Sequence, residues 1–203
     1  DLVTLCEDRI LKILANKDAL FNADGNSNIT ATDKVLGQAI PYSGEHGIST
    51  NPESFASESY RAYFTDKVRG TVMRLSMDGL TPISEFGMKD WFRDNLKLNN
   101  KIVGSYDDKK DEYNISLENT TENIGKSVTF KENVKGWVSF KSFVTNNGIS
   151  CANEYYTFKN ANLWKHNHDV PGNRNTFYGI PNTCSFEVIL NDAPGIVKSF
   201  YTL

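Results

Sequence analysis

The sequence contains few of the residues that build the commonest reactive sites. Its 203 residues include three cysteines and no Cys-x-x-Cys pair, so a zinc ribbon or a thioredoxin-type redox site is disfavoured. Three cysteines also form too few disulfide bonds to hold a chain of this size together. We expect Cys6, Cys151 and Cys184 to be buried or half-buried free thiols. A disulfide bond between Cys151 and Cys184 is the alternative.

Long apolar runs are missing as well. No run of about 18 apolar residues occurs, so no segment is predicted to span a membrane. Residues 1–20 lack the basic start, the continuous apolar stretch and the small-residue cleavage site of a signal peptide. The last six residues, KSFYTL, resemble an unfinished strand without a polar tail. We therefore expect the chain to be a piece of a longer subunit.

Neither charge nor motifs indicate an enzyme. The chain has 22 Lys and Arg residues against 25 Asp and Glu residues, a net charge of −3, so it has no overall basic field that would attract nucleic acid. The Gly-x-Ser-x-Gly elbow, the P-loop and the dinucleotide-binding glycine pattern are absent. We therefore predict that the protein is not an enzyme. We assign no catalytic, cofactor-binding or metal-binding residue and no cofactor.

What the chain does contain is material for strands. Hydrophobic residues make up 39% and aromatic residues 12% of the chain, a composition that supplies a core and favours strands. Short apolar segments recur in pairs across polar turns, which predicts β-hairpins. In YRAYFTDKVRGTVMRLSMDGLTPIS, residues 60–84, turns fall at 66–70 and at Asp78-Gly79. Further hairpins are predicted at residues 4–16, 102–117, 126–143, 155–166 and 184–203.

The spacing of the turns predicts the architecture. Turns near Asp66, Asp108 and Asn160 lie roughly 40–50 residues apart, which is the length of a β-propeller blade. We predict an all-β fold over residues 1–203, made of antiparallel, propeller-like blades that belong to a larger propeller. Loop-forming residues predict a decorated insertion between blades at about 21–59.

One short helix is predicted at residues 87–98. Its apolar residues recur at helical spacing, namely Met88, Trp91, Phe92 and Leu96. We expect this helix to pack across a blade or against an adjoining subunit. Residues 10–20 fit either a strand or a helix.

Three groups of polar residues are candidates for a site, and each has a simpler explanation. His166 and His168 would face one metal ion on a strand, but the polar sequence around them and the lack of a third ligand favour a solvated loop. Residues 22–28, NADGNSN, resemble a calcium loop, but no glutamate closes it, so a turn is favoured. Asp66 and Asp78 stand at turns, where aspartate caps the local backbone.

Aromatic residues crowd the C-terminal half of the chain. Such residues bind sugars when they are exposed, but in adjacent strands they more often fill a core or a seam between sheets. We favour the core interpretation for this group, which comprises Trp137, Phe140, Phe143, Tyr155, Tyr156, Phe158 and Trp164.

Several stretches of the sequence resemble one family. The string at residues 60–96 and the string GSYDDKKDEYNISL resemble the tail stabilisation or nozzle proteins of short-tailed bacteriophages. KGWVSFKSF, NEYYTFKNANLWKHN, NRNTFYG and NDAPGIVKSFYTL are similar to the same group. The crAss-like phages, in which the protein is called the muzzle, are the closest comparison. The resemblance covers the chain from about residue 51 onward.

The resemblance implies a structural role in the virion. Such proteins are β-propeller-bearing subunits that assemble, usually as sixfold rings, at the distal end of the tail. The resemblance also implies contacts with tail adaptor or ring proteins and with tail fibres. It further implies transient passage of genomic DNA through the ring during ejection. The expected location is the phage tail, after assembly in the cytoplasm of the bacterial host.

Two other classes of function compete with this one. A carbohydrate-binding propeller or adhesin would recognise host glycans with exposed tryptophans such as Trp164. A hydrolase would need convergent carboxylates in a central pocket. Exposed, coplanar aromatic rings beside a groove would favour sugar binding, and the same rings buried between sheets would favour the structural role.

Overall fold

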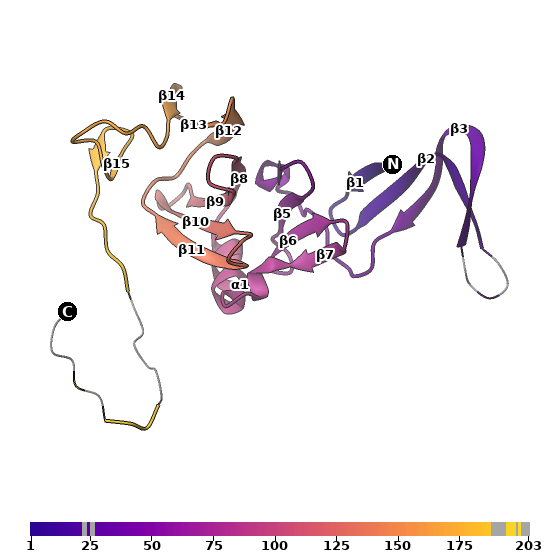
Figure 1. Cartoon of the computed structure of the whole chain (residues 1–203), viewed down its shortest axis with the longest axis horizontal. Coiled ribbons are helices and arrows are strands. Elements are labelled where there is room, and N and C mark those ends of the chain that lie inside the picture. The colour runs from indigo at the N-terminus through magenta and orange to yellow at the C-terminus, as the bar shows by residue number, and fades with distance from the viewer. Residues whose placement is uncertain (22–23, 25–26, 188–193, 198, 200–203) are drawn as a thin grey trace.

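The fold is mostly β-structure. The computed structural model describes the whole chain except residues 22–23, 25–26, 188–193, 198 and 200–203. Half of the chain is in strands, which form several antiparallel sheets, and the described residues include one α-helix. The predicted all-β class is therefore confirmed. Figure 1 shows the sheets following one another along the longest axis of the molecule.

Four sheets follow one another in chain order, and each is a meander of neighbouring strands. The first sheet contains β1 (Leu2–Leu5), β2 (Ile10–Phe21) and β3 (Ser27–Pro41). The second contains β4 (Ala56–Ser57), β5 (Ala62–Asp66), β6 (Thr71–Ser76) and β7 (Gly79–Pro82). The third contains β8 (Lys101–Asp107), β9 (Glu112–Asn119), β10 (Ile124–Lys131) and β11 (Gly136–Lys141). The fourth contains β12 (Asn147–Cys151), β13 (Glu154–Lys159) and β14 (Asn162–Lys165).

Smaller elements connect and extend these sheets. Two 3-10 helices, η1 (Pro52–Ser54) and η2 (Ile83–Glu85), flank the second sheet, and α1 (Lys89–Leu98) joins it to the third. A small hairpin follows the fourth sheet and is formed by β15 (Thr176–Phe177) and β16 (Ile180–Pro181). Among the described residues, no helix has the length and apolar character needed to cross a membrane.

Buried aspartates close two of the predicted hairpins. In the β5–β6 turn the backbone N–H of Arg69 donates to the carboxylate of Asp66, 3.1 Å away. In the β8–β9 turn the N–H groups of Lys109 and Lys110 donate to Asp107. The side chain of Asp66 is fully buried, so its role in forming the turn is confirmed. Hydrogen bonds to a carboxylate at this position satisfy turn N–H groups that have no strand partner.

Some of the sequence predictions need correction. The segment 21–59 is not only a loop insertion, because residues 27–41 form β3, which pairs with β2. The polar composition of β3 is typical of a loop, and this is why the strand was not predicted. Residues 10–20 lie in a strand and not a helix, since β2 pairs with both β1 and β3. The hairpin predicted at 184–203 falls largely outside the described residues. Of the three free thiols, Cys6 is half-buried, whereas Cys151 and Cys184 are exposed and do not form the alternative disulfide.

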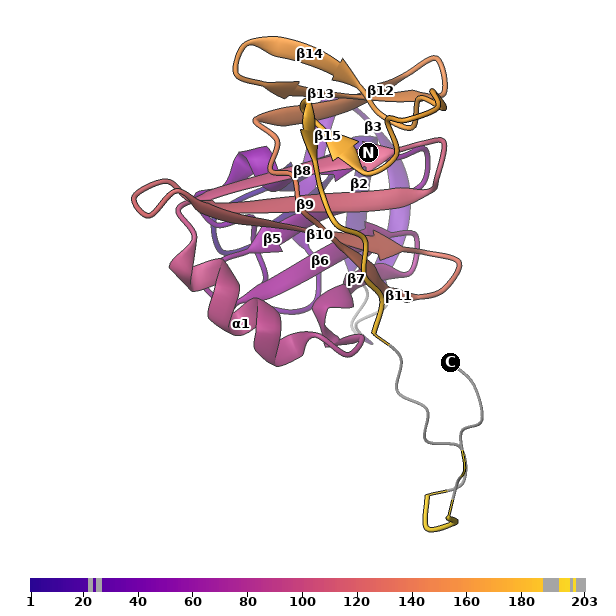
Figure 2. The ribbon, with the colours of Figure 1, turned by 90° about the vertical axis from the view of Figure 1, so that its left-hand side faces the viewer.

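The sheets pack face to face. Ile10 of the first sheet clusters with Phe64 and Met73 of the second. Tyr63 of the second sheet stacks on Tyr113 of the third, with ring centroids 4.7 Å apart. Burial of apolar surface stabilises both seams, and aromatic stacking adds to it at the seam between the second and third sheets. Figure 2 shows the fourth sheet lying over the third.

The helix α1 packs beside the seam between the second and third sheets. Phe92 and Leu96 are fully buried in the core cluster, and Met88 and Trp91 pack against it. The predicted apolar face of this helix is therefore confirmed. Trp137 of β11 closes the seam, since its ring lies 4.4 Å from that of Phe92 and its indole N–H donates to the Ile83 carbonyl.

The first strands of the sheets approach one another closely. Both β4 and β12 contact β8. A Cβ atom on Gly104 of β8 would lie 1.9 Å from the carbonyl oxygen of Ser54, and one on Gly148 of β12 would lie 2.8 Å from the Cβ of Ser105. Only glycine permits backbones to approach this closely.

Candidate functional site

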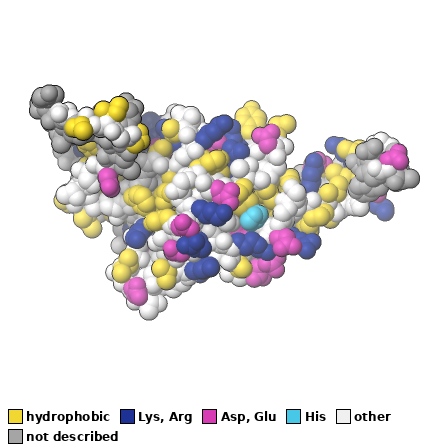
Figure 3. All heavy atoms as spheres, turned by 90° about the horizontal axis from the view of Figure 1, so that it is seen from below, with side chains coloured by type: hydrophobic (Ala, Val, Ile, Leu, Met, Phe, Trp, Pro, Cys, Tyr) yellow, Lys and Arg dark blue, Asp and Glu magenta, His cyan; other side chains and the backbone are white. Residues whose placement is uncertain are grey.

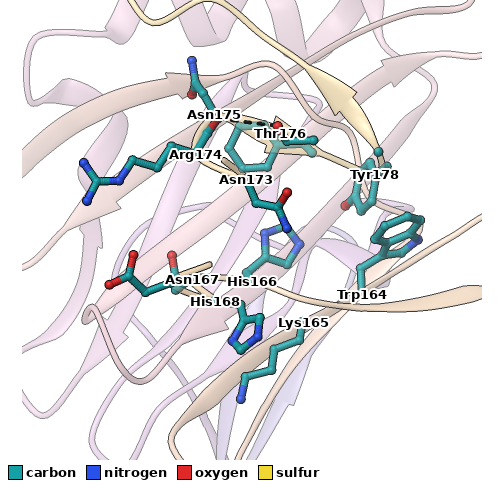
Figure 4. Close-up of a pocket in the computed structure, with 13 residues that line it drawn as sticks. Trp164, Lys165, His166, Asn167, His168, Asn173, Arg174, Asn175, Thr176 and Tyr178 are labelled. Carbon is teal, nitrogen blue, oxygen red and sulfur yellow. Dashed lines mark hydrogen bonds between the residues drawn. The ribbon is translucent and has the colours of Figure 1, made fainter. Parts of the chain in front are cut away.

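A cavity of about 500 Å³ lies where the chain leaves the fourth sheet. Its wall is formed by residues 164–169, which end β14 and follow it, and by residues 173–179, which include β15. The volume is within the usual range for small-molecule sites in proteins. Figure 4 shows Trp164 and Tyr178 together at one side, Arg174 at the other, and His166 and Asn173 between them.

His166 is held at the floor of the cavity by hydrogen bonds. Its Nε2 lies 2.6 Å from the hydroxyl of Thr157, and that hydroxyl lies 2.9 Å from the hydroxyl of Tyr178. Thr157 is fully buried on the inner face of β13. Because side chains alternate between the two faces of β13, Thr157 points toward the residues that follow β14. These hydrogen bonds between His166, Thr157 and Tyr178 thus link the fourth sheet to the β15–β16 hairpin.

Aromatic rings enclose the imidazole of His166. The ring centroids of Phe143, Tyr155 and Tyr178 lie 4.8, 5.2 and 5.9 Å from that of His166. Burial, together with the positive charges of Lys141 and Lys110, lowers the pKa of His166 from 6.5 to about 4. The imidazole is therefore neutral at pH 7.

The two sides of the cavity differ in polarity. At one side the indole of Trp164 meets the ring of Tyr178 edge to face, with centroids 5.5 Å apart and planes 72° apart. Arg174 lies at the other side (Figure 4), and the side chains of three lining residues, Asp169, Asn173 and Arg174, make no hydrogen bond or ion pair with any other described residue. The cavity thus combines an aromatic wall with unpaired donors and acceptors.

A second cavity of about 380 Å³ lies along the first strands β4, β8 and β12. The hydroxyl of Ser150 donates to the carbonyl of Tyr106 and accepts from the N–H of Asp108 there. Burial raises the pKa of Asp108, and the neighbouring charge of Asp107 raises it further. These bonds hold β12 against β8 and join the third and fourth sheets.

The sequence candidates for a metal site are not brought together. Residues 166–168 follow the end of β14, and the imidazoles of His166 and His168 lie on opposite sides of the chain (Figure 4). No three His, Cys, Asp or Glu residues cluster in metal-ligating geometry within the described part of the chain. The calcium-like loop at 22–28 lies largely outside the described residues. His46 instead lies 3.4 Å from the buried Asp66.

The core interpretation of the aromatic group holds for some of its members. Trp137 packs against the core cluster, and Phe143 and Tyr155 are buried. The interpretation is wrong for Phe140 and Phe158, which are 61% and 42% exposed. Phe140 lies in the edge strand β11, and Phe158 lies on the face of β13 opposite to that of Tyr155. Strand alternation turns every second side chain away from the packed face.

Sequence reasoning missed the residues that organise the cavity. Thr157 stands two positions after Tyr155 in a strand pattern, so its burial on the same face could have been inferred from the period of two. Tyr178 and Arg174 come from a segment with no periodicity. Only the return of this segment onto the fourth sheet brings them near His166.

No protein-family model matches this chain, and no curated protein is significantly similar to it in sequence. The resemblance to phage nozzle proteins therefore stays a prediction, and no family is assigned to the chain. The geometry of the seams between the sheets provides the physical support for a proposal about function.

Proposed function

We propose that this chain is a non-enzymatic structural module of a bacteriophage tail tip. In this role it completes and stabilises the tail as part of a nozzle or muzzle ring and contributes to the channel through which DNA is ejected. The observation that carries the proposal is the face-to-face stack of antiparallel sheets in chain order. We take these sheets to be blades of a larger β-propeller.

The close approach of β4, β8 and β12 supports the blade interpretation. In a propeller, one strand of every blade lies next to the central axis, where space is narrowest. A side chain on Gly104 would collide with the Ser54 carbonyl of η1, and one on Gly148 would collide with Ser105 of the third sheet. This placement is the one expected of strands that converge on an axis.

Ion pairs across the seams support a mechanical role. Glu132, in the turn between β10 and β11, accepts from the hydroxyl of Tyr63 at 2.8 Å and from the guanidinium of Arg74 at 2.9 Å. Both donors belong to the second sheet and the acceptor belongs to the third. Charged hydrogen bonds of this kind resist sliding of one sheet on the other because they are directional.

The surface charge is compatible with a DNA conduit. Basic and acidic side chains intermingle on the face seen in Figure 3, and the net charge is −3. A strongly basic wall would retain passing DNA by counterion release. We further propose that the partners are other copies of the chain in a ring, sixfold as the resemblance to nozzle proteins implies, together with tail adaptor proteins and fibres. The location is then the virion, after assembly in the host cytoplasm.

The assembly state tests this function. We expect cryo-EM of the full subunit from virions to reveal a ring of identical copies, coaxial with the portal. A subunit that is absent from purified virions and remains monomeric at high concentration would overturn the proposal. Basic residues lining the lumen of such a ring would refute the argument from charge while leaving the ring itself intact.

A further inference from the structure

We propose that the cavity between β14 and β15 binds a neutral saccharide. The class of ligand is inferred from the arrangement of the cavity walls, and it is independent of the proposed structural role. The cavity is open to solvent and is formed by residues of one continuous stretch, 164–179.

The aromatic wall supplies the first requirement of a sugar site. A pyranose has one face of C–H groups, which packs on aromatic rings, and a rim of hydroxyls. Trp164 and Tyr178 meet edge to face at one side of the cavity (Figure 4), so a sugar would stack on the face of one ring and not on a coplanar pair. Thr157 and His166 anchor Tyr178 from below, so the wall is already in place before a ligand arrives. Such preorganisation lowers the entropic cost of binding.

The polar residues that line the cavity supply the second requirement. Sugar hydroxyls both donate and accept hydrogen bonds, so they need mixed partners. Arg174 offers donors, Asp169 offers acceptors and the amide of Asn173 offers both. None of these three side chains has a partner among the described residues.

The charges favour a neutral ligand over an anion. Lys165 at the edge of the cavity is 3.4 Å from Glu154, which offsets its charge, and Asp169 would repel a phosphate or carboxylate. His166 is uncharged at pH 7 because its imidazole is buried. Arg174 is thus the single unpaired cation among the described lining residues, and one exposed cation in a cavity that also contains a carboxylate makes a poor anion site.

Saturation-transfer NMR of the protein with a panel of methyl pyranosides tests the proposal. We expect saturation transfer to the ring C–H protons of at least one sugar, with a dissociation constant on the order of 1 mM, as is usual for a single small ligand. Trp164→Ala and Arg174→Ala should each weaken binding about tenfold or more. Trp164→Phe should retain part of the affinity, because an aromatic face remains.

Matched controls separate binding from folding. Arg93→Ala removes another exposed arginine, on α1, and should leave sugar binding unchanged. Should Trp164→Ala fail to fold, Asn173→Ala and Arg174→Ala decide the matter, because neither side chain holds another described residue.

Three results would overturn the proposal. The first is the absence of saturation transfer from every sugar in the panel. The second is binding that Arg174→Ala and Arg93→Ala leave equally intact. The third is binding of inorganic phosphate in place of sugars, lost on Arg174→Ala, which would make the cavity an anion site. None of these outcomes bears on whether the subunit forms a ring in the virion.

Discussion

Lowering the pH from 7 to 4 should loosen the segment after β14 through protonation of His166. The pKa of this imidazole falls from 6.5 to about 4 in the folded protein, a difference of about 2.5 units. At about 1.4 kcal/mol per unit, the linked change in the free energy of unfolding is about 3 kcal/mol. The physical cause is burial among aromatic rings, with the cations of Lys141 and Lys110 adding repulsion.

The sign depends on proton uptake. Between pH 6.5 and 4 the unfolded chain binds a proton at His166 and the folded chain does not, so stability decreases as the pH falls through this window. Above pH 6.5 the contribution is fully present, and below pH 4 it is lost. The other titratable groups packed nearby are Tyr155 and Tyr178, whose pKa values are raised by burial and which stay neutral in this range.

Urea unfolding of the wild type and of His166→Phe between pH 7 and pH 4 measures this contribution. Carboxylates also titrate in this range, so the difference between the two proteins isolates the histidine. We expect the wild type to lose up to about 3 kcal/mol more than the variant over the window. His168→Gln is the matched control, because it removes an exposed histidine from the same segment and leaves the enclosure of His166 in place. Parallel pH profiles for the wild type and His166→Phe would refute the reasoning, as would an NMR titration of His166 near pH 6.5.

Three further substitutions test the turns and the seams. Asp66→Ala should lower the free energy of unfolding in urea by about 3–5 kcal/mol, because buried donors that now bond to the carboxylate would lose their partner. A loss below about 1 kcal/mol would contradict the turn assignment. Gly104→Ala should lower the free energy of unfolding by at least about 2 kcal/mol, because the new Cβ would meet the Ser54 carbonyl. Gly136→Ala is the control in the same thermal melts, since the nearest atom to its Cβ would be 3.7 Å away. Tyr63→Phe should cost about 1–2 kcal/mol through loss of one charged hydrogen bond between sheets, and an unchanged melting temperature would show that the bond contributes nothing.

Local patterns in the sequence were sufficient to predict most of the hairpins. Alternating apolar residues around polar turns correctly located β5–β6, β8–β9 and β13–β14, because strand period and turn chemistry are properties of a few neighbouring residues. The apolar spacing of Phe92 and Leu96 located α1 for the same reason. The polar strand β3 was missed, since its pairing with β2 and not its own composition makes it a strand.

Only the tertiary structure decided how these local pieces combine. The sequence by itself determined an all-β chain with aspartates at its turns, but nothing local indicated that Tyr63 meets Glu132, 69 positions further along. In the same way, the residues around His166 indicate only a polar loop, and His166 becomes a neutral, enclosed imidazole because Phe143, Thr157 and Tyr178 converge on it. The burial and the pKa of a side chain depend on which groups, distant in sequence, pack around it. That packing is set by the tertiary fold and not by the local sequence.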